Sequence, residues 1–232
     1  MIDRSLNYGR ASIGGFLRRI APYENVLDLG AGHGDDLAIA QDMCPGCRRI
    51  AVENHPPYAH ALRSSGIECH SLDIERDRLP FDDKSISVVI ANQVLEHIKD
   101  IFWVLHEVSR VLNQGGHFII GVPNLASLHN RVLLAIGRQP TVIKTDSGHV
   151  RGFVLPDFVA FLEACFPGGY IVKQRRGANF YPLPPILAKP AARMFPSMAW
   201  GTMLLLVKCG TYNGGFIRRP LEQGYETRFF VG

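Results

Sequence analysis

The segment Asp28-Leu-Gly30-Ala-Gly32-His-Gly34 combines a carboxylate with three closely spaced glycines directly after an apolar run. Glycines allow a tight turn and a close approach of the backbone to a ligand. In dinucleotide-binding loops the third glycine follows the second by three residues, whereas here it follows by two. Asp28 would repel a pyrophosphate but accept hydrogen bonds from an ammonium group or its waters. The segment therefore predicts a ligand that is cationic at this end and lacks phosphate.

Two further acids follow the next two apolar runs of the chain. Glu53 closes the second run, and a carboxylate there can accept hydrogen bonds from both hydroxyls of a ribose. Asp73 follows the third run, where it could accept from an adenine amino group while Ile74 packs on the adenine face. Asn54, next to Glu53, is counted with the same site. Three acids after three consecutive runs, together with the glycine loop, predict a site for an adenosyl group.

Alternating strands and helices must position these residues. Continuous apolar runs predict buried strands, and apolar residues at helical spacing predict helices between them. The strands are expected at 25–29, 49–53, 67–72, 86–91 and 117–122, and the helices at 35–43, 57–65 and 101–112. This alternation is typical of an α/β fold with a parallel sheet and helices on both faces. Ligands bind such sheets at the carboxyl ends of the strands, so Ala91, Asn92 and Gln93 are also expected at the site.

The second half of the chain is less regular. Helices are expected at 125–137 and 156–166, a long loop at 138–152, and strands at 170–174 and 202–207. Residues 182–200 contain five prolines and are interpreted as an insertion. It is either a helical piece packed on the sheet, which we favour, or an apolar, basic-rimmed wall that contacts acceptor or lipid. The tail from Thr211 onward receives no assignment.

Length and composition indicate one domain over residues 1–232. It would consist of an N-terminal helical cap at 1–24, a cofactor-binding half at 24–123 and an acceptor-binding half at 124–232. Residues 1–24 lack the pattern of a secretory signal, and the most apolar stretch, 199–207, is far shorter than a membrane helix needs. We therefore expect a cytoplasmic protein, and the sequence does not predict its oligomeric state.

The charge distribution and the cysteines limit which partners, disulfides and metals we expect. Residues 1–125 carry a net charge of −4 and residues 126–232 a net charge of +8, which favours an anionic partner for the second half or reflects simple surface variation. No dense basic tract with interleaved aromatic residues occurs, so nucleic acid is not expected. Five cysteines, an odd number, argue against a disulfide framework. Cys44-Pro-Gly-Cys47 is interpreted as a turn, since no further zinc ligands are evident, and no metal is expected.

Several segments resemble class I S-adenosylmethionine-dependent methyltransferases. Val26–Gly34 resembles their motif I. The quinone-biosynthesis-like branch of the family has segments similar to Leu79–Val89, Asn92–Asp100 and Arg110–His117. A bacterial subset associated with glycan or secondary-metabolite modification has segments similar to Pro123-Asn124, Gly137–Thr141 and His149–Arg151. The resemblance is strong over 24–123, moderate over 124–166 and thin beyond.

The resemblance implies a Rossmann-like, seven-stranded, mostly parallel sheet whose last strand runs antiparallel. It also implies S-adenosylmethionine as cofactor. Gly30, Gly32 and Gly34 would line its methionine and ribose, and Glu53 would hold the ribose. Asp73 and Ile74 would hold the adenine, and Ala91 to Gln93 would lie near the sulfonium.

Histidines are the candidates for a general base, which an oxygen acceptor can require. We single out His97, at the start of the helix after the fourth strand, and His149, in the long loop with Arg151 as a substrate contact. His129 is a weaker third, and a structural role remains an alternative for each histidine. The sequence predicts methyl transfer to a hydroxyl of a small-molecule, glycan or lipid-linked acceptor. The alternative is a cofactor-binding regulatory partner without its own methyl transfer. A nicotinamide oxidoreductase conflicts with the glycine spacing and with Asp28.

Overall fold

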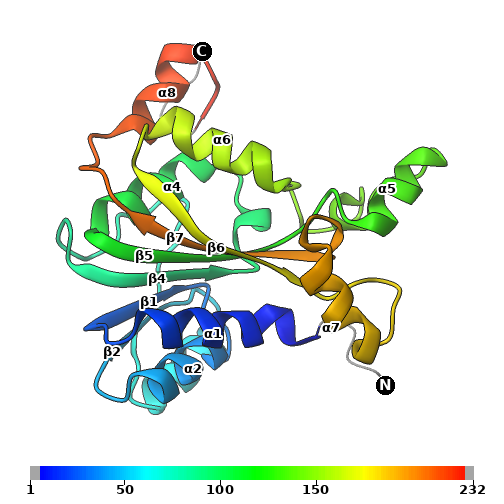
Figure 1. Ribbon diagram of the computed structural model, residues 1–232. Helices are drawn as coiled ribbons and strands as arrows, with labels where there is room; N and C mark the ends of the chain where they lie inside the picture. Colours follow the sequence, from blue (N-terminus) through cyan, green and yellow to red (C-terminus); the bar gives the residue numbers. More distant parts are fainter. Residues whose placement is uncertain (1–5, 228–232) are drawn as a thin grey trace.

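The computed structural model describes residues 6–227, and its seven strands form one mixed sheet (Figure 1). The order across the sheet is β3-β2-β1-β4-β5-β7-β6. β7 runs antiparallel to both of its neighbours, and the pairs from β3 to β5 are parallel. The expected α/β fold with an antiparallel last strand is confirmed. The strands are β1 (Asn25–Leu29), β2 (Arg48–Val52), β3 (Glu68–His70), β4 (Ile86–Asn92), β5 (Leu112–Pro123), β6 (Tyr170–Ala178) and β7 (Gly201–Lys208).

Two layers of helices cover the sheet (Figure 1). One face packs against α4, α6 and α8, which contribute Val108, Phe158 and Phe216 to the larger core cluster. The other face packs against α1, α2 and α3 through residues such as Phe16 and Leu37. The helices are α1 (Arg10–Ile20), α2 (Asp35–Met43), α3 (Pro56–Ser64), α4 (Ile101–Val111), α5 (Leu128–Ala135), α6 (Leu155–Cys165), α7 (Pro185–Met194) and α8 (Gly215–Gln223), with 3-10 turns η1 (Leu6–Gly9), η2 (Leu95–His97), η3 (Thr141–Ile143) and η4 (Pro196–Met198).

The strand order reverses between β1 and β4, which are neighbours in the sheet but not in the chain. From β1 the chain adds strands outward on one side, and from β4 it adds them on the other. In sheets of this kind the crevice for a ligand opens at the carboxyl ends of the two central strands. Here those ends are Leu29 and Asn92, which lead into the glycine loop and into η2.

The expected elements are present in the first half, with small shifts at their ends. β3 spans Glu68–His70 and is shorter than expected, whereas β5 already begins at Leu112. Of the predicted N-terminal cap, residues 6–20 form η1 and α1, and residues 1–5 lie outside the described residues. The tail without assignment contains α8. Cys44 and Cys47 form the expected turn, in which the Cys47 amide donates to the Cys44 carbonyl.

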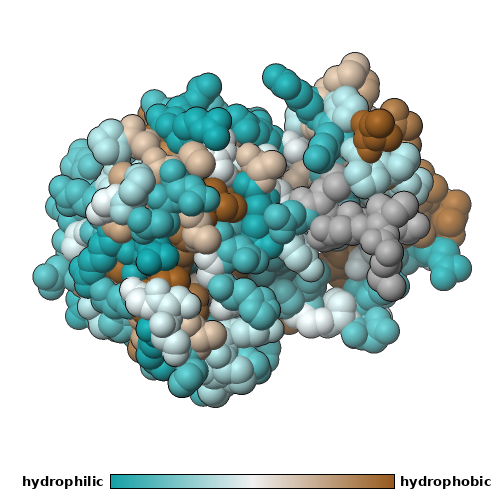
Figure 2. All heavy atoms as spheres, turned by 90° about the horizontal axis from the view of Figure 1, so that it is seen from below, coloured by the Kyte–Doolittle hydropathy of each residue, from teal (hydrophilic) through white to brown (hydrophobic). Residues whose placement is uncertain are grey.

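The insertion at 182–200 contains α7 and η4. Ala188 and Ala192 of α7 pack with Phe180 and Ala199 in a small apolar cluster beside β6, which agrees with the favoured packing role. The helix also exposes apolar side chains, with Ile186 81% and Met194 70% exposed. Figure 2 shows such side chains in brown on the right-hand side, where α5 and α7 project in Figure 1. Among the described residues, no helix combines the length and apolarity needed to cross a bilayer.

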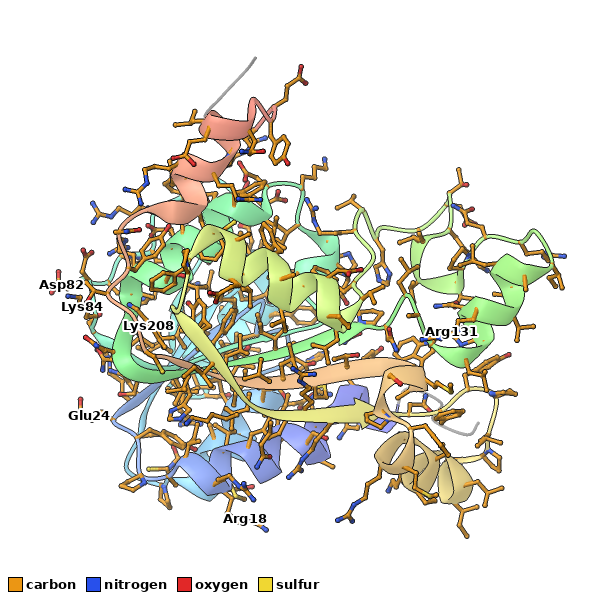
Figure 3. All side chains as sticks on the ribbon, turned by 45° about the horizontal axis from the view of Figure 1, so that its top comes forward. Arg18, Glu24, Asp82, Lys84, Arg131 and Lys208 are labelled. Carbon is orange, nitrogen blue, oxygen red and sulfur yellow. The ribbon has the colours of Figure 1, made fainter. Side chains whose placement is uncertain are left out.

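Lys208 ends β7 far from this projecting region (Figure 3, where Arg131 marks α5). The side chain is 1% exposed, and its Nζ donates hydrogen bonds to the carbonyls of Ser109 and Leu112, both at 2.6 Å. These carbonyls lie at the end of α4, where free acceptors and the helix dipole favour a cation. Burial nevertheless lowers the pKa of Lys208 to about 8.

Replacing Lys208 by methionine is expected to lower the free energy of unfolding by about 1–3 kcal/mol at pH 7, because two buried carbonyls lose their donor. The folded-state pKa of about 8 lies below the ordinary value of 10.5. Between these values the unfolded chain binds a proton that the folded chain has released. The advantage of the wild type over Lys208→Met should therefore grow with pH, by up to about 1.4 kcal/mol per unit. Urea unfolding at about pH 7 and about pH 9.5 measures this, and a constant or shrinking difference would contradict it.

Candidate functional site

The glycine loop turns sharply between β1 and α2, against the residues that follow β4. Gly30 has φ +67°, and a Cβ built there would lie 2.8 Å from Cγ2 of Val94. Gly34 has φ +82°, and its Cβ would lie 2.7 Å from Cδ2 of Leu62. Side chains at these positions would be strained and would collide with their neighbours. At Gly32 no described residue other than its chain neighbours comes within 4 Å of a built Cβ, so the middle of the loop faces open space.

Glu53 connects this loop to the end of β2. Its Oε2 accepts a hydrogen bond from the Gly32 amide at 2.8 Å, and its Oε1 accepts one from the His55 amide at 2.7 Å. The carboxylate is thus held between the loop and the start of α3. Each oxygen can accept a second hydrogen bond, so a diol beside Glu53 would find both acceptors in place.

A buried polar network fills the space beside the loop, on the face that carries α1 and α2. Arg10 of α1 donates from Nε to Oδ1 of Asp36 at 3.1 Å. Asn92, at the end of β4, donates from Nδ2 to Oδ2 of Asp36 at 2.9 Å, and its own Oδ1 is buried without a partner in the described part of the chain. Asp28 is 2% exposed at the end of β1 and interacts electrostatically with Asp36 and Arg10. The network thus joins α1, α2 and β4 to the end of β1.

The electrostatics of this network suit a cation. Burial and then the neighbouring Asp36 raise the pKa of the Asp28 carboxyl well above its usual range, although Arg10 opposes the rise. Burial also raises the pKa of Asp36. A positively charged group beside these carboxyls would favour their ionised forms. The donors and acceptors present therefore fit a ligand with an ammonium or sulfonium group and a ribose.

Asp73 lies in a turn after β3. Its Oδ1 accepts a hydrogen bond from the Glu75 amide, and its Oδ2 lies 3.5 Å from Nε of Arg76. It lines a polar cavity of about 570 Å³, together with Asp100 and Arg151. Ile74 is half-buried and packs against the larger core cluster. The structure thus brings Asp73 and the expected substrate contact Arg151 to one cavity.

The other expected cofactor residues differ in accessibility. Asn54 is exposed after β2, whereas Ala91 is fully buried in the larger core cluster, so its side chain has no free surface for a ligand. Gln93 adopts φ +58°, an uncommon left-handed conformation for a residue other than glycine. Its amide donates to the Gly121 carbonyl, which fixes the turn from β4 into η2.

His97 and His149 lie together although they belong to different segments. Their ring centroids are 4.7 Å apart in an edge-to-face arrangement. His97 Nδ1 lies 3.1 Å from the Gly148 carbonyl, and His149 Nδ1 lies 2.7 Å from the Val142 carbonyl. A carbonyl oxygen only accepts, so each Nδ1 carries a proton and a neutral ring keeps its lone pair on Nε2. In this tautomer Nε2 of each candidate can accept a proton, as a general base must.

His129 and Arg151 have other partners. His129 contacts the hydroxyls of Ser127 and Thr141 and lies against Tyr181. The Arg151 guanidinium donates to the Lys99 carbonyl, and burial lowers its pKa. The backbone amide of Arg151 donates to the Glu96 carbonyl, so the long loop is attached to η2.

Three residues at the site were not predicted from the sequence. Arg10 and Asp36 enter through the packing of α1 on α2, for which the sequence carries no local signal. Glu96 is buried beside the histidine pair, and burial raises its pKa to about 7. Its place in the segment Asn92–Asp100, next to His97, was a signal that could have found it.

Comparison with known proteins agrees with this geometry. Residues 27–120 match the family model described as a methyltransferase domain. This part of the chain is similar to methyltransferase domains. The arsenite methyltransferase of Halobacterium salinarum is 33% identical over 107 residues, which are 44% of this chain and 27% of that protein. The demethylmenaquinone methyltransferase of Thermus thermophilus is 27% identical over 101 residues, which are 42% of this chain and 46% of that protein. The chain thus spans less than half the length of these relatives.

A solved structure shares the fold of this chain over most of its length. The 1,6-didemethyltoxoflavin N1-methyltransferase of Burkholderia thailandensis, with bound 1,6-didemethyltoxoflavin and S-adenosylhomocysteine, superposes with a TM-score of 0.58 at 16% identity. The match covers 90% of this chain and 80% of that one. That structure holds S-adenosylhomocysteine, and the cation-accepting network and Glu53 of this chain fit an S-adenosyl cofactor.

Proposed function

We propose that the protein transfers the methyl group of S-adenosylmethionine to a hydroxyl of a small-molecule, glycan or lipid-linked acceptor. The observation that carries this proposal is the arrangement around the ends of β1, β2 and β4. There the open glycine loop, the Glu53 carboxylate and the network of Asp28 and Asn92 meet at the reversal of strand order. The cofactor supplies an already activated methyl group, so the protein's main task is alignment.

The assigned roles follow from these positions. Glu53 holds the ribose, and the glycine loop lets the backbone approach the methionine. Asp28 and Asp36 face the cationic end, with Arg10 placed for the methionine carboxylate. Asp73 and Ile74 flank the adenine.

Features on the acceptor side support a hydroxyl-bearing molecule with an apolar part. His97 and His149 each have a lone pair on Nε2. Such a nitrogen can accept the proton that a hydroxyl group loses when it is methylated. Beside the polar cavity lies an apolar one of about 540 Å³, and both are lined by Phe102 and Arg151. Arg151 suits an anionic group on the acceptor, in keeping with the basic second half of the chain.

Titration calorimetry with S-adenosylhomocysteine tests the cofactor site. We expect one molecule to bind per chain, because the acceptors for its ribose and ammonium groups are already in position. A folded sample that shows no binding would refute the proposal. Incubation with methyl-labelled S-adenosylmethionine and hydroxylated acceptors distinguishes the regulatory alternative. A regulatory partner would bind the cofactor but label no acceptor.

A further inference from the structure

Three side chains of metal-binding type converge where the long loop meets η2. Glu96 and His97 belong to η2, and His149 comes from the loop between α5 and α6. One ligand atom from each residue, a carboxylate oxygen or a ring nitrogen, lies within 4.8 Å of the other two. The set of two histidines and one carboxylate is a common one for divalent transition metals.

The Glu96 carboxylate is buried beside the two histidines. Glu96 is 1% exposed, and within residues 6–227 neither of its carboxylate oxygens has a hydrogen-bond partner. A buried carboxylate without hydrogen bonds is costly, and native proteins rarely leave one unsatisfied. Its backbone carbonyl accepts hydrogen bonds from the amides of Val150 and Arg151, which hold the loop with His149 against η2. The fold thus keeps the Glu96 carboxylate beside the histidines, and no described residue is placed as its hydrogen-bond partner.

Both histidines make the kind of backbone hydrogen bond that metal-binding histidines usually make. In each ring Nδ1 donates to a backbone carbonyl, of Gly148 for His97 and of Val142 for His149. Histidines that bind metals commonly donate the other ring proton to a carbonyl or carboxylate, which fixes the tautomer and the ring orientation. The two carbonyls belong to the loop that also carries His149, so one segment orients both rings.

We infer that Glu96, His97 and His149 bind a divalent first-row transition-metal ion. Ligands about 2.1 Å from a tetrahedral ion lie about 3.4 Å apart, so the largest separation must shorten by roughly 1.4 Å on binding. His97 is exposed and His149 lies on a loop, so both can make this adjustment. Three protein ligands leave a coordination position open, which is typical of catalytic rather than structural sites.

The metal site gives the proposed function its acceptor chemistry, and this part rests on that function. The glycine loop approaches Val94, two residues before Glu96, so the three ligands lie next to the cofactor region. A hydroxyl oxygen at the open position has its pKa lowered by the metal and releases its proton to solvent at neutral pH. The oxygen then forms a bond to the methyl carbon while the carbon–sulfur bond breaks, which leaves a neutral thioether. The inference replaces the expectation of a chain without a metal. It also replaces the general-base role of His97 and His149, because a ring nitrogen that binds a metal has no lone pair left to accept a proton.

Metal binding is tested on the full chain without a histidine tag, after treatment with EDTA and without cofactor. Zn²⁺ is followed by calorimetry and Co²⁺ by its visible absorption. We expect one equivalent of either ion to bind and to raise the melting temperature. Glu96→Gln and His149→Ala should each weaken metal binding by about 100-fold or more. Mutation of residues that only hydrogen-bond to metal ligands already lowers metal affinity by about 10–100-fold. His60→Ala, which removes an exposed histidine of α3, is the matched control and should bind like the wild type.

Glu96→Gln keeps the shape of the side chain and removes an unpaired buried charge, so the metal-free variant should melt no lower than the wild type. A wild type that binds neither ion, or binding that persists in both Glu96→Gln and His149→Ala, would overturn the inference. S-adenosylhomocysteine calorimetry separates the two proposals. Cofactor binding without metal binding removes only the metal site, and metal binding without cofactor binding removes only the proposed methyl transfer.

Discussion

Glu53→Gln is expected to weaken the binding of S-adenosylhomocysteine by about 100-fold, which corresponds to the loss of about 3 kcal/mol. The Glu53 carboxylate accepts from the amides of Gly32 and His55 while it keeps capacity for two ribose hydroxyls. A glutamine offers one acceptor oxygen and places an NH2 group against one of the two amide donors. The variant therefore loses one of the two backbone contacts and one acceptor for the ribose. Titration calorimetry measures the change.

The matched control is Glu24→Gln, the same substitution at an exposed residue just before β1 (Figure 3). It should bind S-adenosylhomocysteine like the wild type. Glu53 is only partly buried, so both variants should unfold within about 1 kcal/mol of the wild type. Wild-type affinity in Glu53→Gln would show that the carboxylate does not hold the ribose.

Glu107→Ala is expected to lower the free energy of unfolding by about 3–5 kcal/mol, because it removes the buried counter-ion of Arg110 and leaves only the exposed Asp83 as its ion-pair partner. In α4 the Arg110 guanidinium donates to both oxygens of Glu107, at 2.8 and 2.7 Å. The same guanidinium donates to the carbonyls of Leu79 and Phe81, and Glu107 accepts from the Leu79 amide. The pair thus fastens the segment before β4 to α4. Urea unfolding measures the loss.

Glu222→Ala, at an exposed position of α8, is the control and should change stability by less than about 0.5 kcal/mol. The double variant Glu107→Leu, Arg110→Met tests the cause. It removes both charges together, so we expect it to lose less stability than Glu107→Ala alone. A double variant that is less stable than Glu107→Ala would mean that the hydrogen bonds to Leu79 and Phe81, and not the charge balance, dominate.

Local patterns predicted the first half of the chain well. β1 and α2 have the bounds expected from the sequence, and the glycines between them adopt the left-handed conformations that such a turn requires. Arg110 begins a family-like segment, but its role in the buried pair with Glu107 became visible only in the structure. The sequence does not predict α8, because this helix is stabilised by burial of Phe216 against the larger core. A short segment alone does not encode that burial.

The Asp28–Gly34 loop shows the same division between local and long-range information. The sequence by itself determined the loop, its exclusion of a pyrophosphate, and the acids at the strand ends, because backbone conformation and strand burial depend on neighbouring residues. Only the tertiary structure placed Arg10 and Asp36 beside Asp28 and brought His149 to Glu96 and His97. These contacts join segments far apart in the chain. They depend on how helices and loops pack on the sheet, and no local pattern of residues encodes that packing.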